Sequence, residues 1–237
     1  MLLSDVRGRR VRAESRVNLT ISDKHGLTVK LNEVGAPLET AEVDAVRKLV
    51  ESRLDKARWL MICGSLQPGV PPHFYAEIIG LAQQRGVRTL LDTDGDALVQ
   101  ALEAKPSVIS PNQSEAERLL GRAIITRAQS LEALELIHGM GPESVLLSLG
   151  ARGALLASAE GLFEALPPRV DALCPIGAGD ALAAAFAWAL DKKKSHAEAL
   201  RWAVAAGTAT AVLPGISFPT FDQTRALYKQ VQVKSLR

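Results

Sequence analysis

The sequence is poor in aromatic residues and cysteine, and its charges nearly cancel. Phe, Trp and Tyr make up 4% of the 237 residues, which argues against a surface that stacks nucleic-acid bases. The net charge of +2 lacks the basic excess of a protein built to bind nucleic acid. The two cysteines, Cys63 and Cys174, exclude a disulfide framework and cannot alone form a four-ligand zinc site. Both are better read as small buried apolar residues than as nucleophiles.

Long apolar runs are also missing. No run reaches the roughly 18 residues of a membrane span. Residues 1–5 lack the basic-then-apolar pattern of a signal peptide. Hydrophobic residues nevertheless make up 47% of the chain, which is enough for a sizeable core. We therefore expect one cytoplasmic domain over residues 1–237, with neither nucleic acid nor a membrane as partner.

The first 35 residues differ from the rest. Five arginines between Arg7 and Arg16 most simply form a solvated face, although they could meet phosphate. Residues 17–21 and 27–31 alternate apolar and polar side chains on either side of His25-Gly26. This period of two predicts a hairpin or meander of half-exposed strands.

From residue 36 onward, short apolar runs alternate with segments of helical period. The alternation predicts an α/β fold with a mostly parallel central sheet and helices on both faces. Apolar residues at helical spacing over 43–54 indicate the first helix. Strands are predicted over 59–63, 88–91, 107–110 and 145–149, paired strands over 154–158 and 162–166, and helices over 74–84, 97–103, 115–120, 131–138, 182–190, 197–212 and 223–231.

The segment Gly177-Ala178-Gly179-Asp180 precedes an alanine-rich helix. Two glycines around a small residue let backbone N–H groups approach an anion, and the helix adds its positive end. Asp180 would repel a phosphate, but it suits a base that takes a proton from a hydroxyl attacking that phosphate. The plainer alternative is that Asp180 caps the helix.

Other polar groups follow predicted strands, where ligands bind in open parallel sheets. Asn112 and Glu115 are three residues apart and would suit a hydrated Mg²⁺ ion, or equally a helix capping box. Gly150 and Gly153, with Ser148, could lie against a nucleotide, although glycines are common in turns. Two further strand-end segments are Gly64-Ser65 and residues 92–95. The four histidines show no metal-ligand spacing and are taken as surface or structural residues.

The order of these motifs resembles that of the PfkB, or ribokinase-like, family of carbohydrate kinases. The motifs are Gly64-Ser65-Leu66-Gln67-Pro68-Gly69, Pro111-Asn112-Gln113-Ser114-Glu115, Ser148-Leu149-Gly150-Ala151-Arg152-Gly153, Gly177-Ala178-Gly179-Asp180 and Ala205-Ala206-Gly207-Thr208-Ala209-Thr210. The stretch Ser15-Arg16-Val17-Asn18 resembles the sugar-phosphate branch, which includes the 1-phosphofructokinases, the tagatose-6-phosphate kinases and the minor 6-phosphofructokinases.

The resemblance implies a ribokinase-like three-layer sandwich and an ATP- and Mg²⁺-dependent kinase. Its substrate would be fructose 1-phosphate, fructose 6-phosphate or tagatose 6-phosphate. Asp180 would be the catalytic base, and Gly177, Ala178 and Gly179 the anion hole. Asn112 and Glu115 would organise Mg²⁺. The nucleotide would contact Asn112, Ser148, Gly150, Gly153, Ala206 and Gly207, and the acceptor would contact Arg16, Asn18, Gly64 and Ser65.

The chain also departs from the family pattern. The family's N-terminal strands and lid are absent or reduced, so that residues 1–35 would be residual lid or edge strands, and the Gly-Gly-x-x-x-Asn segment is absent. Cys174-Pro175-Ile176 replaces a Thr-rich stretch and Leu213-Pro214-Gly215 replaces a late Asn-x-Gly-x-Arg stretch, which makes a monovalent-cation site doubtful. The alternative function is therefore a nucleotide-binding module without an acceptor half. The chain could form a homo-oligomer. A dinucleotide-dependent dehydrogenase is a poor alternative, because no Gly-x-Gly-x-x-Gly motif follows the first strand.

Overall fold

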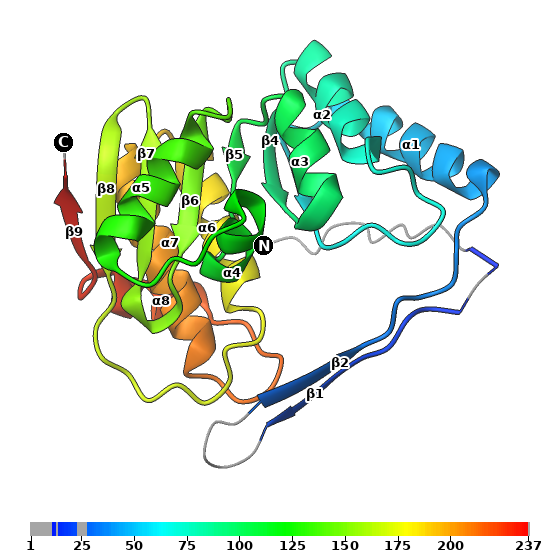
Figure 1. Ribbon diagram of the computed structural model, residues 1–237. Helices are drawn as coiled ribbons and strands as arrows, with labels where there is room; N and C mark the ends of the chain where they lie inside the picture. Colours follow the sequence, from blue (N-terminus) through cyan, green and yellow to red (C-terminus); the bar gives the residue numbers. More distant parts are fainter. Residues whose placement is uncertain (1–10, 13, 23–27, 237) are drawn as a thin grey trace.

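The computed structural model describes residues 11, 12, 14–22 and 28–236, arranged as a small hairpin beside a large sheet with helices (Figure 1). The strands are β1 (Asn18–Ser22), β2 (Thr28–Asn32), β3 (Trp59–Cys63), β4 (Arg88–Asp92), β5 (Val108–Ile109), β6 (Ser144–Ser148), β7 (Ala154–Ser158), β8 (Gly161–Leu166) and β9 (Gln232–Ser235). The helices are α1 (Thr40–Leu54), α2 (Phe74–Gln84), α3 (Gly95–Glu103), α4 (Gln113–Leu120), α5 (Arg127–His138), the short 3₁₀ turn η1 (Gly150–Arg152), α6 (Ala178–Asp191), α7 (His196–Ala211) and α8 (Phe221–Tyr228).

The large sheet has the strand order β3-β4-β5-β6-β7-β8-β9. Strands β3 to β6 are parallel, and β7, β8 and β9 each run antiparallel to the neighbour before them. Strand β8 therefore points the same way as β3 to β6. The predicted α/β fold with a mostly parallel sheet is confirmed. Because β3 to β6 are parallel, their carboxyl ends meet at one edge of the sheet.

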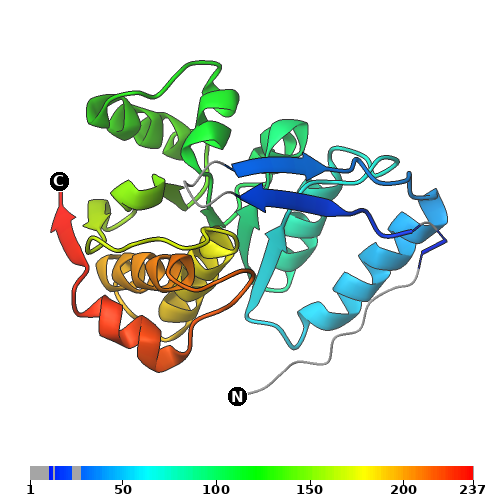
Figure 2. The ribbon, with the colours of Figure 1, turned by 90° about the horizontal axis from the view of Figure 1, so that it is seen from below.

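Helices cover both faces of this sheet, which gives three layers (Figure 2). Successive strand residues point to opposite faces. Leu90 packs in the core shared with α6 and α7, whereas Leu91 packs in the core shared with α2, α3 and α5. Leu146 and Leu147 divide in the same way, and all four are almost fully buried. Each such side chain contributes about 1.5–3 kcal/mol through the area it removes from water.

The hairpin of β1 and β2 forms as predicted, but its apolar side is exposed. The two strands pair antiparallel, with Leu19 opposite Leu31 and Ile21 opposite Val29. These four side chains are 48–54% exposed. The prediction of half-exposed strands is confirmed, and the hairpin projects away from the core (Figure 1). The turn at His25-Gly26 lies outside the described residues, as do Arg7, Arg9 and Arg10.

The C-terminal segment differs from the expected helix over 223–231. Helix α8 ends at Tyr228, and residues 232–235 form an edge strand paired with β8. The chain reverses between them, and Val231 is buried in the core there. Val231 lies at helical spacing from the apolar residues of α8, so the sequence alone does not show that the helix ends before it. Within the part of the chain that is described, no helix combines the length and apolar character needed to cross a membrane.

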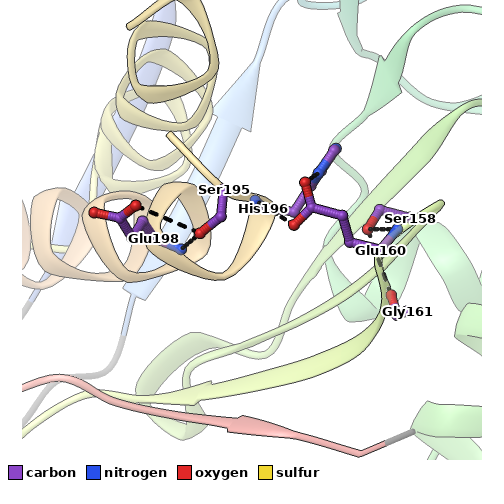
Figure 3. A network of polar contacts seen from close by, with 6 residues as sticks. All are labelled: Ser158, Glu160, Gly161, Ser195, His196 and Glu198. Atoms are coloured by element: carbon purple, nitrogen blue, oxygen red, sulfur yellow. Dashed lines mark hydrogen bonds and ion pairs between the residues drawn. The ribbon is translucent and has the colours of Figure 1, made fainter. Parts of the chain in front are cut away.

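A polar network ties the β7–β8 turn to the start of α7 (Figure 3). Glu160 Oε1 lies 2.8 Å from His196 Nδ1, and its Oε2 accepts a hydrogen bond from the His196 N–H at 3.0 Å. The hydrogen bond from the His196 ring lowers the pKa of Glu160. Ser195 caps α7 by accepting from the Glu198 N–H at 3.2 Å. His196 thus anchors a helix end, as expected of a structural histidine.

Candidate functional site

The segment 177–180 forms the start of α6 at the carboxyl edge of the sheet. Gly177 is the N-cap, with a φ of 81° that favours glycine, and Ala178, Gly179 and Asp180 make up the first turn. Such a turn leaves N–H groups without intrahelical partners. The N–H of Ala178 donates to the Pro175 carbonyl at 3.1 Å. The backbone N–H groups left to bind an anion are therefore chiefly those of Gly179 and Asp180.

Asp180 does not cap α6, since the N-cap is Gly177 and no side chain accepts a capping bond there. The capping alternative for Asp180 is therefore wrong. Its side chain is exposed and its carboxylate lies near two groups at the ends of strands. Asp92 ends β4 and Cys63 ends β3, and one donor atom from each of the three residues lies within 4.8 Å of the others.

This cluster has unusual electrostatics. Burial, followed by the nearby Glu115, Asp180 and Asp94 carboxylates, raises the pKa of Asp92 to about 7. Burial, followed by Asp92 and Asp180, raises the pKa of the Cys63 thiol to about 11. Burial also raises the pKa of Glu115. Ionisation of these acidic groups is therefore costly at this point, and a bound cation would lower that cost.

Asn112 and Glu115 form the capping box at the start of α4. Asn112 Oδ1 accepts from the Glu115 N–H at 3.0 Å, and Glu115 Oε2 accepts from the Asn112 N–H at 2.9 Å. The capping alternative is thus present. It does not exclude a second role, because Glu115 lies close enough to Asp92 to affect its charge. Asn112 also bridges to Ser148 at the end of β6.

A pocket of about 710 Å³ opens beside the start of α6. It lies between η1, the 167–172 loop and the facing sides of α6 and α7. Its walls are mainly small and apolar, which suits a flat ring system. Of the residues predicted to contact a nucleotide or its phosphates, the walls include Ser148, Gly150, Gly153, Ala178, Gly179 and Gly207.

Comparison with known proteins decides the family. A family model described as pfkB family carbohydrate kinase matches residues 11–221. The chain belongs to the pfkB family of carbohydrate kinases.

Individual pfkB relatives agree with this assignment. A 1-phosphofructokinase of Rhodobacter capsulatus is 33% identical over 229 residues, covering 96% of this chain and 72% of the relative. A D-tagatose-1-phosphate kinase of Klebsiella oxytoca is 33% identical, covering 93% of this chain and 71% of the relative. A crystal structure of Escherichia coli phosphofructokinase-2 in complex with potassium is 30% identical with a TM-score of 0.81, covering 90% of this chain and 70% of that one.

Membership of the pfkB family makes the chain a carbohydrate kinase with a ribokinase-like fold. It also implies ATP and a divalent metal. The donor set fits a hard divalent cation, since Asp92 and Glu115 offer carboxylate oxygens in a region of uncompensated negative charge. The roles of individual residues and the monovalent-cation expectation stay predictions.

On the other side of the site, the structure brings Arg16 toward the Gly64 loop. The Tyr75 hydroxyl donates to the Gly64 carbonyl at 3.0 Å, and the charge of Arg16 acts on that same tyrosine. Arg16 also packs beside Gly35, where a Cβ would lie 3.4 Å from the Arg16 Cβ. Ser65 follows Gly64 and is exposed. Asn18 lies further along, at the start of β1, opposite Asn32.

Close packing explains why two of the residues predicted to contact the nucleotide are glycines. A Cβ on Gly153, whose φ is 93°, would lie 2.0 Å from the Ala165 carbonyl oxygen. A Cβ on Gly207 would lie 3.1 Å from the Ala178 carbonyl oxygen, so this glycine lets α7 approach α6 closely. Ala206, on α7, is buried and is not among the residues that line the pocket. The two glycines shape the pocket even where their atoms do not reach a ligand.

Sequence reasoning missed Cys63 and gave Asp92 no role. Both residues end strands of the parallel sheet, and they are directly paired in the register of β3 with β4. The signal was therefore available, because polar residues at the ends of adjacent parallel strands converge. The expectation that Cys63 is a small buried residue is wrong, because its side chain is exposed at the end of β3.

Proposed function

We propose that the chain transfers the γ-phosphoryl group of ATP to a hydroxyl group of a phosphorylated ketohexose. The observation that carries this proposal is the placement of Asp180. Its exposed carboxylate directly follows Ala178 and Gly179, which line the 710 Å³ pocket that suits a nucleotide. A base beside an anion-binding turn is what phosphoryl transfer to an alcohol requires.

The Asp180 carboxylate takes the proton of the acceptor hydroxyl as its oxygen forms a bond to the γ-phosphorus. The bond between that phosphorus and the bridging oxygen breaks, and ADP leaves with the electron pair. The helix turn at 177–180 faces the charge that develops on the transferred group. Catalysis of this kind depends on positioning and on charge neutralisation.

Asp92, Asn112 and Glu115 would hold the divalent cation. Bound there with ATP, Mg²⁺ would neutralise phosphate charge. These residues support it because the Glu115 carboxylate lies near enough to raise the pKa of Asp92. Neither carboxylate has a cationic partner in an ion pair within the described part of the chain.

The acceptor is a sugar phosphate because Arg16 offers an unpaired guanidinium beside the Gly64–Ser65 loop. Among the described residues Arg16 takes part in no ion pair. An arginine binds phosphate through a fork of N–H donors. The candidates are fructose 1-phosphate, fructose 6-phosphate and tagatose phosphates, in keeping with relatives named 1-phosphofructokinase and D-tagatose-1-phosphate kinase.

A second candidate is a module that binds nucleotide without transferring phosphate. The pocket is built from residues 148–211 alone, and the chain spans about 72% of the length of the first curated relatives. This reading predicts ATP affinity without turnover. A homo-oligomer also remains a proposal, in view of a tetrameric form of the Escherichia coli phosphofructokinase-2.

The deciding experiment measures ADP release by the purified chain with Mg²⁺ and ATP. The acceptors are fructose 1-phosphate, fructose 6-phosphate, tagatose 6-phosphate, tagatose 1-phosphate and the unphosphorylated sugars. We expect turnover with one sugar phosphate and a loss of about 10²–10⁴-fold in Asp180→Asn, the range for a general base. ATP binding without acceptor-dependent turnover would favour the second candidate.

A further inference from the structure

Three side chains from distant parts of the sequence converge at the carboxyl edge of the sheet. Cys63 comes from the end of β3, Asp92 from the end of β4, and Asp180 from the first turn of α6. The Cys63 sulfur and one oxygen from each carboxylate lie within 4.8 Å of one another. In a tetrahedral zinc site, metal–ligand distances of about 2.0–2.3 Å put donor atoms roughly 3.5 Å apart. Small side-chain rotations would suffice to reach that spacing.

The backbone holds two of these donors in register. Cys63 and Asp92 are paired residues of neighbouring parallel strands, and the Gly64 N–H donates to the Asp92 carbonyl at 2.8 Å. The two side chains therefore leave the same face of the sheet, toward α6. The site thus stands on two strands and a helix, and not on a loop.

None of the three side chains has an internal partner within the described residues. Asp92 and Asp180 take part in no ion pair there, and Cys63 is a free thiol. Other carboxylates of the region differ, because Asp94 pairs with Arg118 at 2.8 Å and Glu115 belongs to the capping box. Of the three, Asp92 is half-buried and without a partner, which calls for an explanation, and a bound ion is one.

The sulfur decides which cations fit this donor set. Mg²⁺ binds oxygen ligands, so it could bind the two carboxylates here but not the thiol. Zn²⁺ and similar borderline-soft cations accept thiolate together with carboxylate, and they bind well to three protein ligands and a water. The site is thus distinct in chemistry from a magnesium site formed by carboxylate and amide oxygens.

We propose that Cys63, Asp92 and Asp180 form a binding site for a thiophilic divalent cation such as Zn²⁺. As the metal–sulfur bond forms, the thiol releases its proton to solvent, and water fills the fourth position. Binding occupies the carboxylate of Asp180. Zinc is then an inhibitor of the kinase, and this consequence, unlike the binding itself, rests on the proposed function.

The test measures metal binding directly. The chain is first stripped of metal, and its Zn²⁺ binding is then measured by calorimetry in a buffer that contains excess Mg²⁺. In a parallel titration, Co²⁺ replaces Zn²⁺ as a spectroscopic probe. We expect one Zn²⁺ per chain and a thiolate-to-cobalt charge-transfer band. Cys63→Ser should lose the band and weaken Zn²⁺ binding at least about 10-fold. Loss of a residue that only hydrogen-bonds to a metal ligand already weakens binding by about 10–100-fold, and loss of a ligand itself should cost no less. Asp92→Asn should weaken binding while keeping the thiol.

Cys174→Ser is the matched control, since the other cysteine lies outside the cluster and should leave both signals unchanged. A measurement without variants is alkylation of the wild-type chain, in which Zn²⁺ should protect Cys63 and not Cys174. A cobalt band that survives in Cys63→Ser, the absence of Zn²⁺ binding, or equal alkylation of Cys63 with and without Zn²⁺ would overturn the proposal. Because these readouts need no turnover, an inactive chain would contradict the proposed kinase activity without affecting this result.

Discussion

The carboxylates of Asp92 and Asp180 meet across the space between the sheet and α6, within 4.8 Å of each other and of the Cys63 thiol. One ends a strand and the other begins a helix, so the framework of the fold sets their approach. Burial, and then the nearby carboxylates of Glu115 and Asp180, make the ionised state of Asp92 costly.

We expect this cost to appear in the pH dependence of stability. The folded state raises the Asp92 pKa from 3.8 to about 7, so it holds the proton more tightly than the unfolded chain does. The contribution of Asp92 to the free energy of unfolding therefore falls as pH rises from about 4 to about 7. Asp92→Asn should remove this slope and stabilise the chain at pH 8 by roughly 2 kcal/mol.

Urea unfolding between pH 4 and pH 8, without divalent metal, measures this effect. Asp96→Asn is a suitable control because Asp96 lies nearby, in the first turn of α3, outside the cluster. A variant Asp92→Asn with the wild-type slope would show that Asp92 ionises freely.

Two glycines of the β6–β7 connection should differ sharply in their tolerance of alanine. A Cβ on Gly153 would collide with the Ala165 carbonyl oxygen at 2.0 Å, whereas Gly150, with a φ of 61°, has open space around it. Gly153→Ala should cost several kcal/mol, since backbone must move, and Gly150→Ala about 1 kcal/mol from strain alone. Thermal unfolding of the two variants makes the comparison, and equal costs would contradict it.

Arg16 should contribute to binding of the sugar-phosphate acceptor and not to binding of ATP. Arg16→Ala should raise KM for the sugar phosphate by about 10–100-fold, equivalent to roughly 1.5–3 kcal/mol for a charge-assisted hydrogen bond, while leaving KM for ATP unchanged. Steady-state kinetics with each substrate varied separately measures the split. Arg12→Ala is the control, because Arg12 pairs with Glu39 at 3.2 Å on the exposed side of the same segment. An equal rise in both KM values would remove Arg16 from the acceptor side.

The aromatic cluster on α7 and α8 should contribute to stability through Trp202. Its ring stacks on Tyr228 with centroids 4.4 Å apart and on Phe221 at 5.4 Å, and it is only 9% exposed. Trp202→Ala should destabilise the chain by about 3–5 kcal/mol. Trp188→Ala, at a ring that is 38% exposed, should cost less. Urea denaturation followed by circular dichroism compares the two.

The sequence predicts the sheet well and the site in part. Residues 59–63 and 74–84 have the predicted bounds because their patterns are short, apolar and closed by turn residues. The edge strand at 232–235 escapes prediction, since two of its four side chains are charged or amide-bearing and its pairing with β8 is not local. The order of glycine motifs indicates the α6 turn. The ends of two predicted strands indicate that Cys63 and Asp92 converge, but nothing in the sequence indicates that Asp180 joins them, because that depends on the position of α6.

The β1–β2 hairpin has a consequence for how the molecule unfolds. Its strands bond to each other, its apolar residues face solvent, and an isolated two-stranded ribbon is at best marginally stable in water. The free energy of opening the hairpin is therefore far below that of opening the sheet. Amide hydrogen exchange should separate the chain into two cooperative units, with Leu19 and Leu31 exchanging early and Leu90 and Leu146 only through global unfolding. The segment that carries Arg16 thus joins a part of the protein that opens readily to a part that does not.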